Sequence, residues 1–143
     1  MINKEHLKAR KLGECYRKLF ASPEYIEIHG YPECVSQLQN HSCLGFAKHE
    51  NLNIWALAGD DDKFIKISPS TLADNGETLK QLAVQGCGIA CISSFTANED
   101  VLLGRLIPLL EEHTIKQPIA IYAVFYSANA MNNRLRCFFG LYQ

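Results

Sequence analysis

Residues 70–94, STLADNGETLKQLAVQGCGIACISS, decide which fold the chain adopts. Asp74 suits the N-cap of a helix, and Glu77, three residues later, completes a capping box. We therefore expect a helix from this point to Gly86, a residue that closes helices readily in the left-handed conformation. Residues 88–92, GIACI, are small and apolar on both faces, which is typical of a buried parallel strand.

The predicted helix directs its unpaired amide groups, and the positive end of its dipole, toward the residues that precede it. Those residues, 68–75, lead from a predicted strand into the helix. In open α/β sheets, ligands collect at the carboxyl ends of strands and the amino ends of helices. This segment is therefore the first candidate for a ligand site.

The rest of the chain alternates predicted strands with predicted helices, with no repeat and no linker, which predicts one α/β domain with a mixed sheet. Pro108 cannot donate to a strand ladder, so the strand around it is expected at a sheet edge. In the tail, Leu135, Phe138, Phe139 and Tyr142 recur along one side of a predicted helix. The expected strands are 15–22, 42–47, 52–59, 63–68, 105–110 and 118–126, and the expected helices are 22–30, 32–38, 98–104 and 132–142.

The 143 residues are 48% hydrophobic and 20% charged, the balance of a single soluble globular domain. The net charge of -1 provides no field that would draw the chain to nucleic acid or anionic lipid. Residues 1–14 lack the apolar core of a secretory signal, and the longest apolar run, 119–125, is too short to cross a bilayer. These features predict a cytoplasmic protein without a direct nucleic-acid or membrane partner.

The six cysteines are expected to be reduced thiols, because cytoplasmic proteins rarely form disulfides. None of them forms a C-x-x-C pair. Cys87 and Cys91 lie four residues apart, on one face if both belong to a strand, which suits small core residues better than metal ligands. Structural thiols are therefore favoured over a zinc site. The six residues are Cys15, Cys34, Cys43, Cys87, Cys91 and Cys137.

Motifs for enzymatic catalysis are missing from the sequence. It has no G-x-S-x-G elbow, phosphate loop or H-E-x-x-H helix, and its five histidines are scattered. Residues 60–62, three aspartates, suit a solvated hairpin turn better than a calcium loop, which needs spaced donors and a glycine. Ser93 and Ser94 follow a buried strand, where capping or ligand hydrogen bonding is favoured over a nucleophilic role. We expect a protein that is not an enzyme and needs no cofactor.

Several short segments, each weakly informative alone, follow one another in an order that resembles the effector-binding domain of LysR-type transcriptional regulators. The resemblance covers Leu7 to Tyr142, nearly the whole chain. Besides residues 73–95, the segments are ASPEYIEIHG (21–30), LQNHSCL (38–44), WALAG (55–59), LLGRLIPLL (102–110), PIAIYAVF (118–125) and RLRCFFGLY (134–142).

The resemblance implies one lobe of a type 2 periplasmic-binding-protein-like α/β fold, with a mixed, mostly parallel sheet and helices on both faces. In that family two lobes are joined by two crossing strands and hold a small effector between them. The expected organisation is a single truncated effector-binding domain over residues 1–143. Residues 14–124 would form the main lobe, and 1–13 and 125–143 would be remnants of the other lobe. The winged helix-turn-helix of the family has no counterpart in the sequence, so DNA binding is not carried over.

The resemblance also implies that the amino end of the helix after Asn75 faces the effector cleft. The loop after Phe46 would line the same cleft, and Lys48 together with the helix end suits a carboxylate. For Asp74 and Asn75, helix capping and ligand binding both stay open, whereas a structural role is favoured for Phe46 and the two serines. The candidate ligand-binding residues are Thr71, Asp74, Asn75, Phe46, Lys48, Ser93 and Ser94.

The expected function is that of a regulator-derived domain that binds a small, anionic effector and acts in transcription regulation without its own DNA-binding part. The alternative is a protein-interaction module that self-associates or pairs with a full-length LysR-type regulator without binding a ligand. A homodimer is expected, because truncation leaves the apolar side of the tail uncovered. Its predicted contact residues are Leu135, Phe138, Phe139 and Tyr142.

Overall fold

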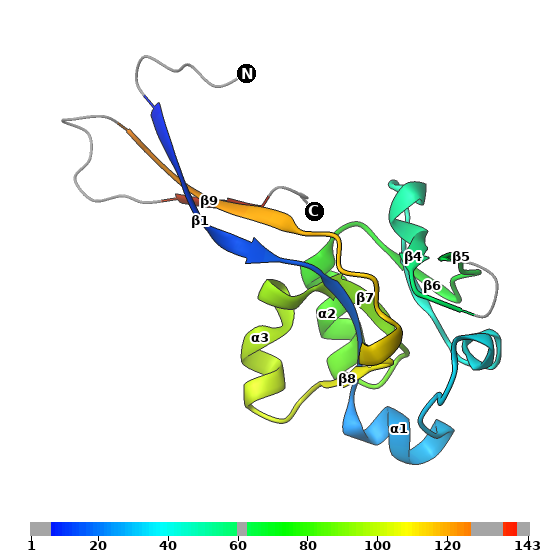
Figure 1. Ribbon diagram of the computed structural model, residues 1–143. Helices are drawn as coiled ribbons and strands as arrows, with labels where there is room; N and C mark the ends of the chain where they lie inside the picture. The colour runs from blue at the N-terminus through cyan, green and yellow to red at the C-terminus, as the bar shows by residue number, and fades with distance from the viewer. Residues whose placement is uncertain (1–6, 60–62, 127–135, 140–143) are drawn as a thin grey trace. The chain divides into compact units, whose positions relative to one another are not determined.

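The computed structural model describes residues 7–59, 63–126 and 136–139, which fall into two compact units. The main unit comprises residues 16–117, and the strand unit takes its described residues from 7–15, 118–126 and 136–139. Figure 1 traces the chain through both units. All candidate ligand-binding residues belong to the main unit.

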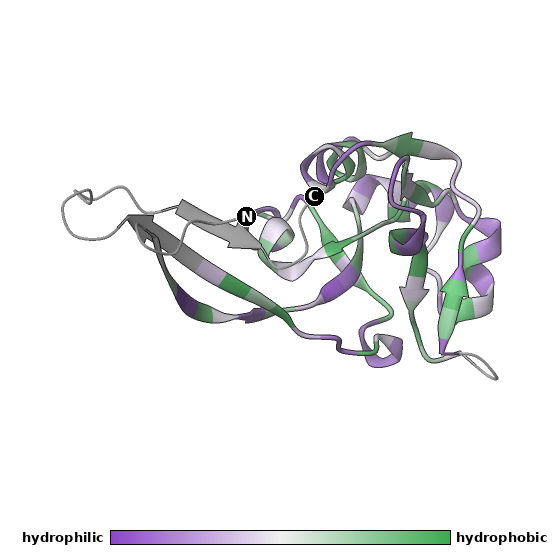
Figure 2. Ribbon diagram, turned by 90° about the horizontal axis from the view of Figure 1, so that it is seen from above, coloured by the Kyte–Doolittle hydropathy of each residue, from purple (hydrophilic) through white to green (hydrophobic). Residues whose placement is uncertain are grey.

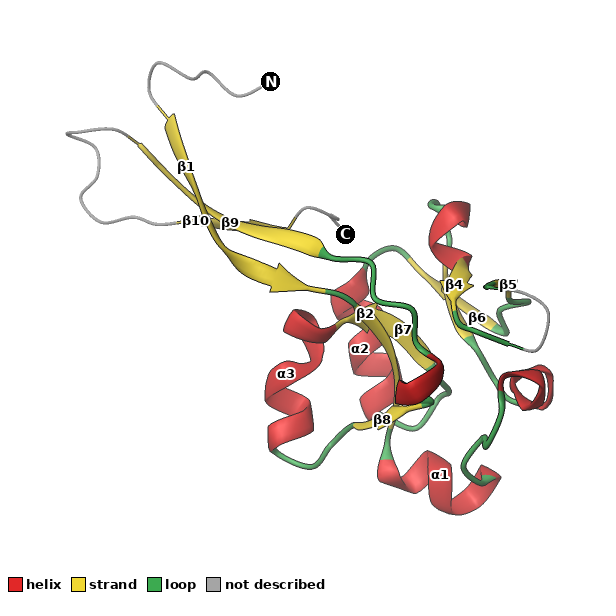
Figure 3. Cartoon of the chain, in the orientation of Figure 1, coloured by secondary structure: helices red, strands yellow, loops and turns green. Residues whose placement is uncertain are grey.

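The strand unit is a three-stranded antiparallel sheet in the order β1, β9, β10 (Figure 3). β1 is Leu7–Cys15, β9 is Ile119–Tyr126 and β10 is Arg136–Phe139. The strand predicted at 118–126 is therefore confirmed.

The helix predicted at 132–142 is wrong where the structure describes it, because residues 136–139 pair with β9. Phe138 lies opposite Tyr122, and Phe139 lies opposite Ile121. Aromatic residues favour strands when a neighbouring strand offers its edge, so this pairing overrides the helical spacing of the apolar residues. Leu135 and Tyr142, which complete the predicted apolar side, lie outside the described residues.

The main unit is built around β2 (Arg17–Ala21), which lies between β7 (Ala90–Ser93) and β8 (Ile107–Leu109) and pairs antiparallel with both. β8 is an outer strand of this sheet, as expected from Pro108. β3 (Leu44–Phe46) runs parallel to β6 (Thr71–Ala73), and a bridge between Cys43 and Ile89 connects β3 to the segment that leads into β7. The mixed α/β fold is confirmed.

Parallel pairing is less extensive than the sequence predicts. Within the described residues it is limited to β3 with β6 and to the Cys43–Ile89 bridge. The expectation of a mostly parallel sheet is therefore wrong. The apolar run at 88–92 indicated burial on both faces, but a strand that is covered on both faces can pair in either direction.

Capping residues in the sequence define both ends of the first helix of the main unit. In α1 (Pro23–His29), Ser22 Oγ accepts a hydrogen bond from Tyr25 N at 3.0 Å, and Gly30 ends the helix at a φ of 86°, as predicted. The helix predicted at 32–38 is a 3₁₀ helix that starts later. The remaining short elements are the 3₁₀ helices η1 (Val35–Asn40), η2 (Glu50–Asn53) and η3 (Glu111–His113), and the predicted antiparallel hairpin of β4 (Ile54–Ala56) and β5 (Phe64–Lys66).

α2 (Gly76–Val84) and α3 (Ser94–Leu102) each run for nine residues. Asn75 rather than Asp74 caps α2, because Asn75 Oδ1 accepts from Thr78 N at 2.8 Å. The predicted capping box is therefore wrong. Gly86 follows α2 with a φ of 84°, in the predicted left-handed conformation. α3 begins four residues before the predicted helix at 98–104, because Ser93 caps it.

Both faces of β2 and β7 are covered. Leu19 of β2 and Cys91 of β7 lie opposite each other and belong to a hydrophobic cluster that includes Tyr25 of α1 and Trp55 of β4. Phe20 and its partner Ala90 point to the other face, because side chains alternate along a strand, and α2 and α3 pack on the same strands. Figure 2 shows hydrophobic residues on several strands and many hydrophilic residues on the helices.

The predicted core is correct in part. Trp55, Leu79, Ile89 and Ile92 are buried. Leu82 is partly buried in the main unit, whereas Tyr122 is 38% exposed and belongs to the strand unit, so the placement of Tyr122 is wrong.

A buried carboxylate holds α2 and α3 together. Asp100 of α3 is 2% exposed, and its carboxylate lies 3.1 Å from Lys80 Nζ of α2 and 3.1 Å from Arg105 Nη1. Lys80 Nζ also lies 3.1 Å from Glu77 Oε2. Removal of one partner would leave a buried charge uncompensated, so these ion pairs restrain the position of α3 against α2.

β3 approaches its neighbours so closely that only glycine fits at position 45. A Cβ atom there would lie 2.5 Å from Pro69 Cγ and 2.8 Å from Asn53 Oδ1. The backbone of β3 therefore packs directly against the segment that follows β5.

Leu79→Ala removes a fully buried side chain from α2, and we expect it to lower the free energy of unfolding by about 2–5 kcal/mol. Urea denaturation followed by circular dichroism measures this change. Leu102→Ala is the matched control, because Leu102 lies in the adjacent helix α3 and is 77% exposed, so its effect should stay below about 0.5 kcal/mol. Equal effects of the two substitutions would contradict the placement of α2 against the sheet.

Gly45→Ala is expected to destabilise the protein by about 1–3 kcal/mol, because the ring of Pro69 is rigid and Asn53 is held by hydrogen bonds. Gly13→Ala is the control, since nothing lies within 4 Å of a Cβ atom built there, and its effect should stay within about 0.5 kcal/mol. Thermal denaturation compares both variants with the parent. A Gly45→Ala variant that unfolds at the parent's midpoint would refute the close approach.

Candidate functional site

Three strands of the main unit end at one edge of the sheet. β3 and β6 pair in parallel from Leu44 opposite Thr71 to Phe46 opposite Ala73, and the Cys43–Ile89 bridge aligns β7 with β3 in the same direction. Two residues separate the end of β6 from the start of α2, and α3 starts directly after β7. We refer to residues 46–49, 74–75 and 93–94 as the carboxyl-end edge. It combines three strand ends with the amino ends of two helices.

The start of the loop after β3 is held by a buried amide. Asn53 Oδ1 accepts from Phe46 N at 2.7 Å, and Asn53 Nδ2 donates to Phe46 O at 3.0 Å. Ala47 N donates to Ala73 O at 2.9 Å, which ties the loop to β6. Phe46 is 4% exposed, so its ring contributes to the core, whereas Lys48 is exposed.

Sequence reasoning missed the role of Asn53. The residue lies between Leu52 and Ile54 in a segment predicted as a strand, and it is 7% exposed. A polar side chain inside an apolar segment needs hydrogen-bond partners when it is buried. That pattern was the available signal, but it does not indicate that the partner is the backbone of Phe46.

Of the three candidate residues near the start of α2, Asp74 and Asn75 lie at the carboxyl-end edge and Thr71 does not. Asn75 caps the helix, and the carboxylate of Asp74 is exposed beside it. Thr71 is also exposed, but it lies opposite Leu44 at the amino end of β6. The two intervening strand residues and Asp74 separate Thr71 from Asn75, so the structure does not place Thr71 at the edge.

The two serines have structural contacts. Ser93 is 5% exposed, and its Oγ accepts from the amides of Phe95 and Thr96 at 3.1 Å each. Ser94 Oγ accepts from Tyr16 N at 3.3 Å, and Ser94 N donates to Tyr16 O at 2.8 Å. Ser93 therefore caps α3, and Ser94 connects the helix to the residue that precedes β2.

Charges of both signs lie near the start of α2. Glu77 and Asp74 are negative, and Lys80 is already paired with Glu77 and Asp100. Burial lowers the pKa of Lys80, but the nearby carboxylates of Asp100 and Glu77 outweigh burial and raise its pKa overall. Lys80 therefore stays protonated and engaged, and Lys48 is the candidate residue at the edge that offers an exposed ammonium group.

The cysteines do not form a metal site in the described part of the chain. Across residues 7–59, 63–126 and 136–139, no three His, Cys, Asp or Glu side chains are grouped so as to hold a metal ion. Cys87 is exposed in the turn after α2 while Cys91 is buried in β7, so the two do not share a strand face. Burial raises the pKa of Cys91 and raises that of Cys43 to about 11, so both thiols stay protonated at neutral pH.

Among the described helices, none is long and apolar enough to span a membrane.

Comparisons with known proteins agree with this architecture. The family described as the LysR substrate binding domain matches residues 2–143. The chain is 44% identical over 132 residues to the HTH-type transcriptional regulator CrgA of Neisseria meningitidis serogroup C (strain 8013), covering 92% of the chain and 44% of that protein. It is 32% identical over 133 residues to the HTH-type transcriptional regulator DmlR of Escherichia coli (strain K12), covering 92% of the chain and 43% of that protein. The chain thus spans less than half the length of these curated relatives.

Solved structures show the same fold. The regulatory domain of CrgA from Neisseria meningitidis superposes with a TM-score of 0.77 at 42% identity, covering 85% of this chain and 60% of that one. The regulatory domain of AphB from Vibrio vulnificus shares the fold with a TM-score of 0.67 at 23% identity, covering 89% of this chain and 63% of that one. The family match over residues 2–143 and the likeness to CrgA in both sequence and structure lead to one conclusion: the chain belongs to the LysR substrate-binding domain family of transcriptional regulators.

Proposed function

We propose that this chain is the effector-binding part of a transcription-regulating system and that its carboxyl-end edge binds a small anionic molecule. The observation that supports the proposal most directly is the meeting of the α2 and α3 amino ends with the strand ends of β3, β6 and β7. Its curated relatives carry the names of transcriptional regulators, which supports a role in regulation. In this proposal the chain catalyses no reaction and acts on DNA only through another protein segment.

The first turn of α2 offers hydrogen-bond donors to an anion. The amides of Gly76 and Glu77 precede the first intrahelical hydrogen bond, and Asn75 Oδ1 already satisfies the amide of Thr78. The helix dipole adds partial positive charge at the same point. Lys48 supplies a full positive charge from the loop after β3.

Asp74 acts in the opposite direction. Its exposed carboxylate stands beside the cap and repels an anion by the same Coulomb interaction that makes Lys48 attractive. The two side chains therefore give the proposal a sign that can be tested: removal of the lysine charge weakens anion binding, and removal of the aspartate charge strengthens it.

The effector test uses the parent chain and a panel of mono- and dicarboxylates, phosphate and sulfate in a thermal-shift assay. A ligand at a hundredfold excess over its Kd adds about 2.7 kcal/mol to the stability, which is readily detected. For the best ligand, we expect Lys48→Ala to weaken the affinity about two- to fivefold and Asp74→Asn to strengthen it by a similar factor. Lys63→Ala, at an exposed lysine directly before β5, is the control and should leave the affinity unchanged. A flat panel, or identical affinities for all variants, would contradict anion binding at this edge.

Self-association is a second candidate function, supported by the strand unit. In the order β1, β9, β10, the strands β1 and β10 are the outer strands of the described sheet, and outer strands readily pair with another chain. Phe138 and Phe139, two of the predicted contact residues, lie in β10. The partner in this proposal is a second copy of the chain or a full-length LysR-type regulator.

Sedimentation velocity of the purified chain tests the dimer, which we expect at micromolar concentration. The double substitution Phe138→Asp and Phe139→Asp should convert it to a folded monomer, because two desolvated carboxylates cannot be accommodated in an apolar contact. Leu102→Asp with Leu103→Asp, on the exposed end of α3, is the matched control and should leave the dimer intact. Far-UV circular dichroism establishes that each variant is folded. A parent chain that sediments as a monomer at high micromolar concentration would refute self-association.

A further inference from the structure

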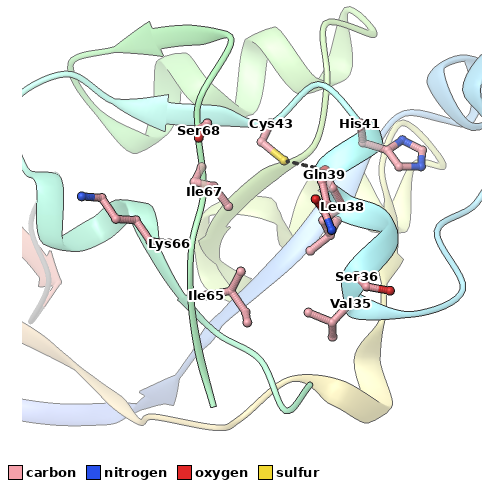
Figure 4. Close-up of a pocket in the computed structure, with 10 residues that line it drawn as sticks. All are labelled: Val35, Ser36, Leu38, Gln39, His41, Cys43, Ile65, Lys66, Ile67 and Ser68. Carbon is pink, nitrogen blue, oxygen red and sulfur yellow. Dashed lines mark hydrogen bonds between the residues drawn. The ribbon is translucent and has the colours of Figure 1, made fainter. Parts of the chain in front are cut away.

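A pocket of about 390 Å³ lies in the main unit, away from the carboxyl-end edge. Figure 4 shows it between η1 and the segment from Ile65 to Ser68, which continues from β5 toward β6. Cys43, which is 4% exposed and directly precedes β3, also lines the pocket. The pocket therefore borders the amino ends of β3 and β6, whereas the proposed effector site lies at their carboxyl ends.

The floor of the pocket is apolar and well packed. Val35 and Ile67 are each 7% exposed, and Leu38 and Cys43 are each 4% exposed. These four side chains belong to the hydrophobic cluster of the main unit, and Ile65 packs against the cluster. Because the same residues hold the core together, the floor keeps its shape whether or not a ligand is present.

The rim of the pocket carries groups that form hydrogen bonds without charge. Ser36, Gln39 and Ser68 are exposed lining residues whose side chains, two hydroxyls and one amide, can each donate and accept, and the Ser36 hydroxyl lies 3.2 Å from Cys34 Sγ. His41 is the fourth polar rim residue, and its Nδ1 lies 2.8 Å from the Tyr25 hydroxyl.

His41 is neutral at pH 7. Burial and the nearby His29 lower its pKa. The Tyr25 hydroxyl accepts from Ser42 N at 3.1 Å, which leaves its own proton to be donated to His41 Nδ1. In this arrangement the imidazole proton resides on Nε2.

Lys66 is the charged residue among those that line the pocket, and its side chain points away from the pocket. Ile65 lies opposite the buried Trp55, whereas Lys66 lies opposite the exposed Ile54, so successive side chains point to opposite sides of β5. Figure 4 shows Ile65 and Ile67 directed toward η1 and Lys66 directed away. A charged ligand in this pocket would therefore lose water without gaining a counter-charge from a lining side chain.

We propose that this pocket is a second small-molecule site, which takes a compact uncharged ligand with an apolar body and one or two hydrogen-bonding groups. Its volume lies in the range of small-ligand sites, and its apolar floor with a few polar groups is the composition such sites share. Binding is noncovalent, because the Cys43 thiol at the floor stays protonated. The proposal does not depend on an anion binding at the carboxyl-end edge.

The test compares a neutral probe with a charged probe of nearly the same shape. Benzyl alcohol and benzoate are titrated separately into ¹⁵N-labelled chain, and amide shifts are followed by NMR; phenol, indole and cyclohexanol extend the neutral set. We expect saturable shifts with the neutral probes at residues 35–43 and 65–68, and no saturable shifts there with benzoate. Any shift caused by benzoate at Gly76 reports on the carboxyl-end edge, so the two sites are read separately.

Gln39→Trp fills the mouth of the pocket with an indole ring and should weaken the neutral probes by about tenfold or more. Asn40→Trp is the matched control, since Asn40 is the next residue of η1, is exposed and does not line the pocket. It should bind the probes like the parent. The proposal is overturned if none of the neutral probes gives saturable shifts at these residues, if benzoate binds there as well as benzyl alcohol does, or if Gln39→Trp and Asn40→Trp behave alike.

Discussion

The carboxyl end of β3 stays in place because the side chain of Asn53 pairs with both backbone polar groups of Phe46. These groups are buried, and leaving one without a partner costs about 1–3 kcal/mol. An N-cap contributes about 1 kcal/mol, so the pairing at Phe46 outweighs the caps of α2 and α3 at the same edge. Asn53 can approach so closely only because residue 45 is glycine. The hydrogen bonds that hold β3 therefore contribute more to the geometry of the carboxyl-end edge than the N-caps of the two helices do.

Features that depend on a few neighbouring residues could be predicted from the sequence. Ser22, Pro23 and Gly30 define α1, and the β4–β5 hairpin follows from two apolar segments around a polar turn. Features that depend on a distant partner could not. Residues 136–139 have an acceptable helical spacing, and only the presence of β9 beside them makes a strand the better structure. The direction of β7 likewise follows from its neighbour β2, because burial on both faces does not encode direction.

The same distinction applies to the candidate sites. The sequence identified the region of the α2 start but not which of two adjacent residues caps it, since aspartate and asparagine serve equally well and β6 decides where the chain turns. Thr71 was assigned to the site because it is near in sequence, and the extended geometry of β6 carries it away. The hydrogen bonds of Asn53 and the pocket beside η1 both depend on residues from separate segments of the chain, so a local sequence pattern does not predict them.

The central position of β2 also has a consequence for how the chain folds. Its register partners lie at residues 90–93 and 107–109, so the sheet cannot form until a loop of most of the main unit has closed. Loop closure of this length slows folding, and a strand with two buried faces stays uncovered in the meantime. During synthesis, residues 17–21 leave the ribosome long before either partner does. The apolar face of β2 is thus exposed on the nascent chain for as long as that takes, which leaves this strand open to non-native contacts until its partners arrive.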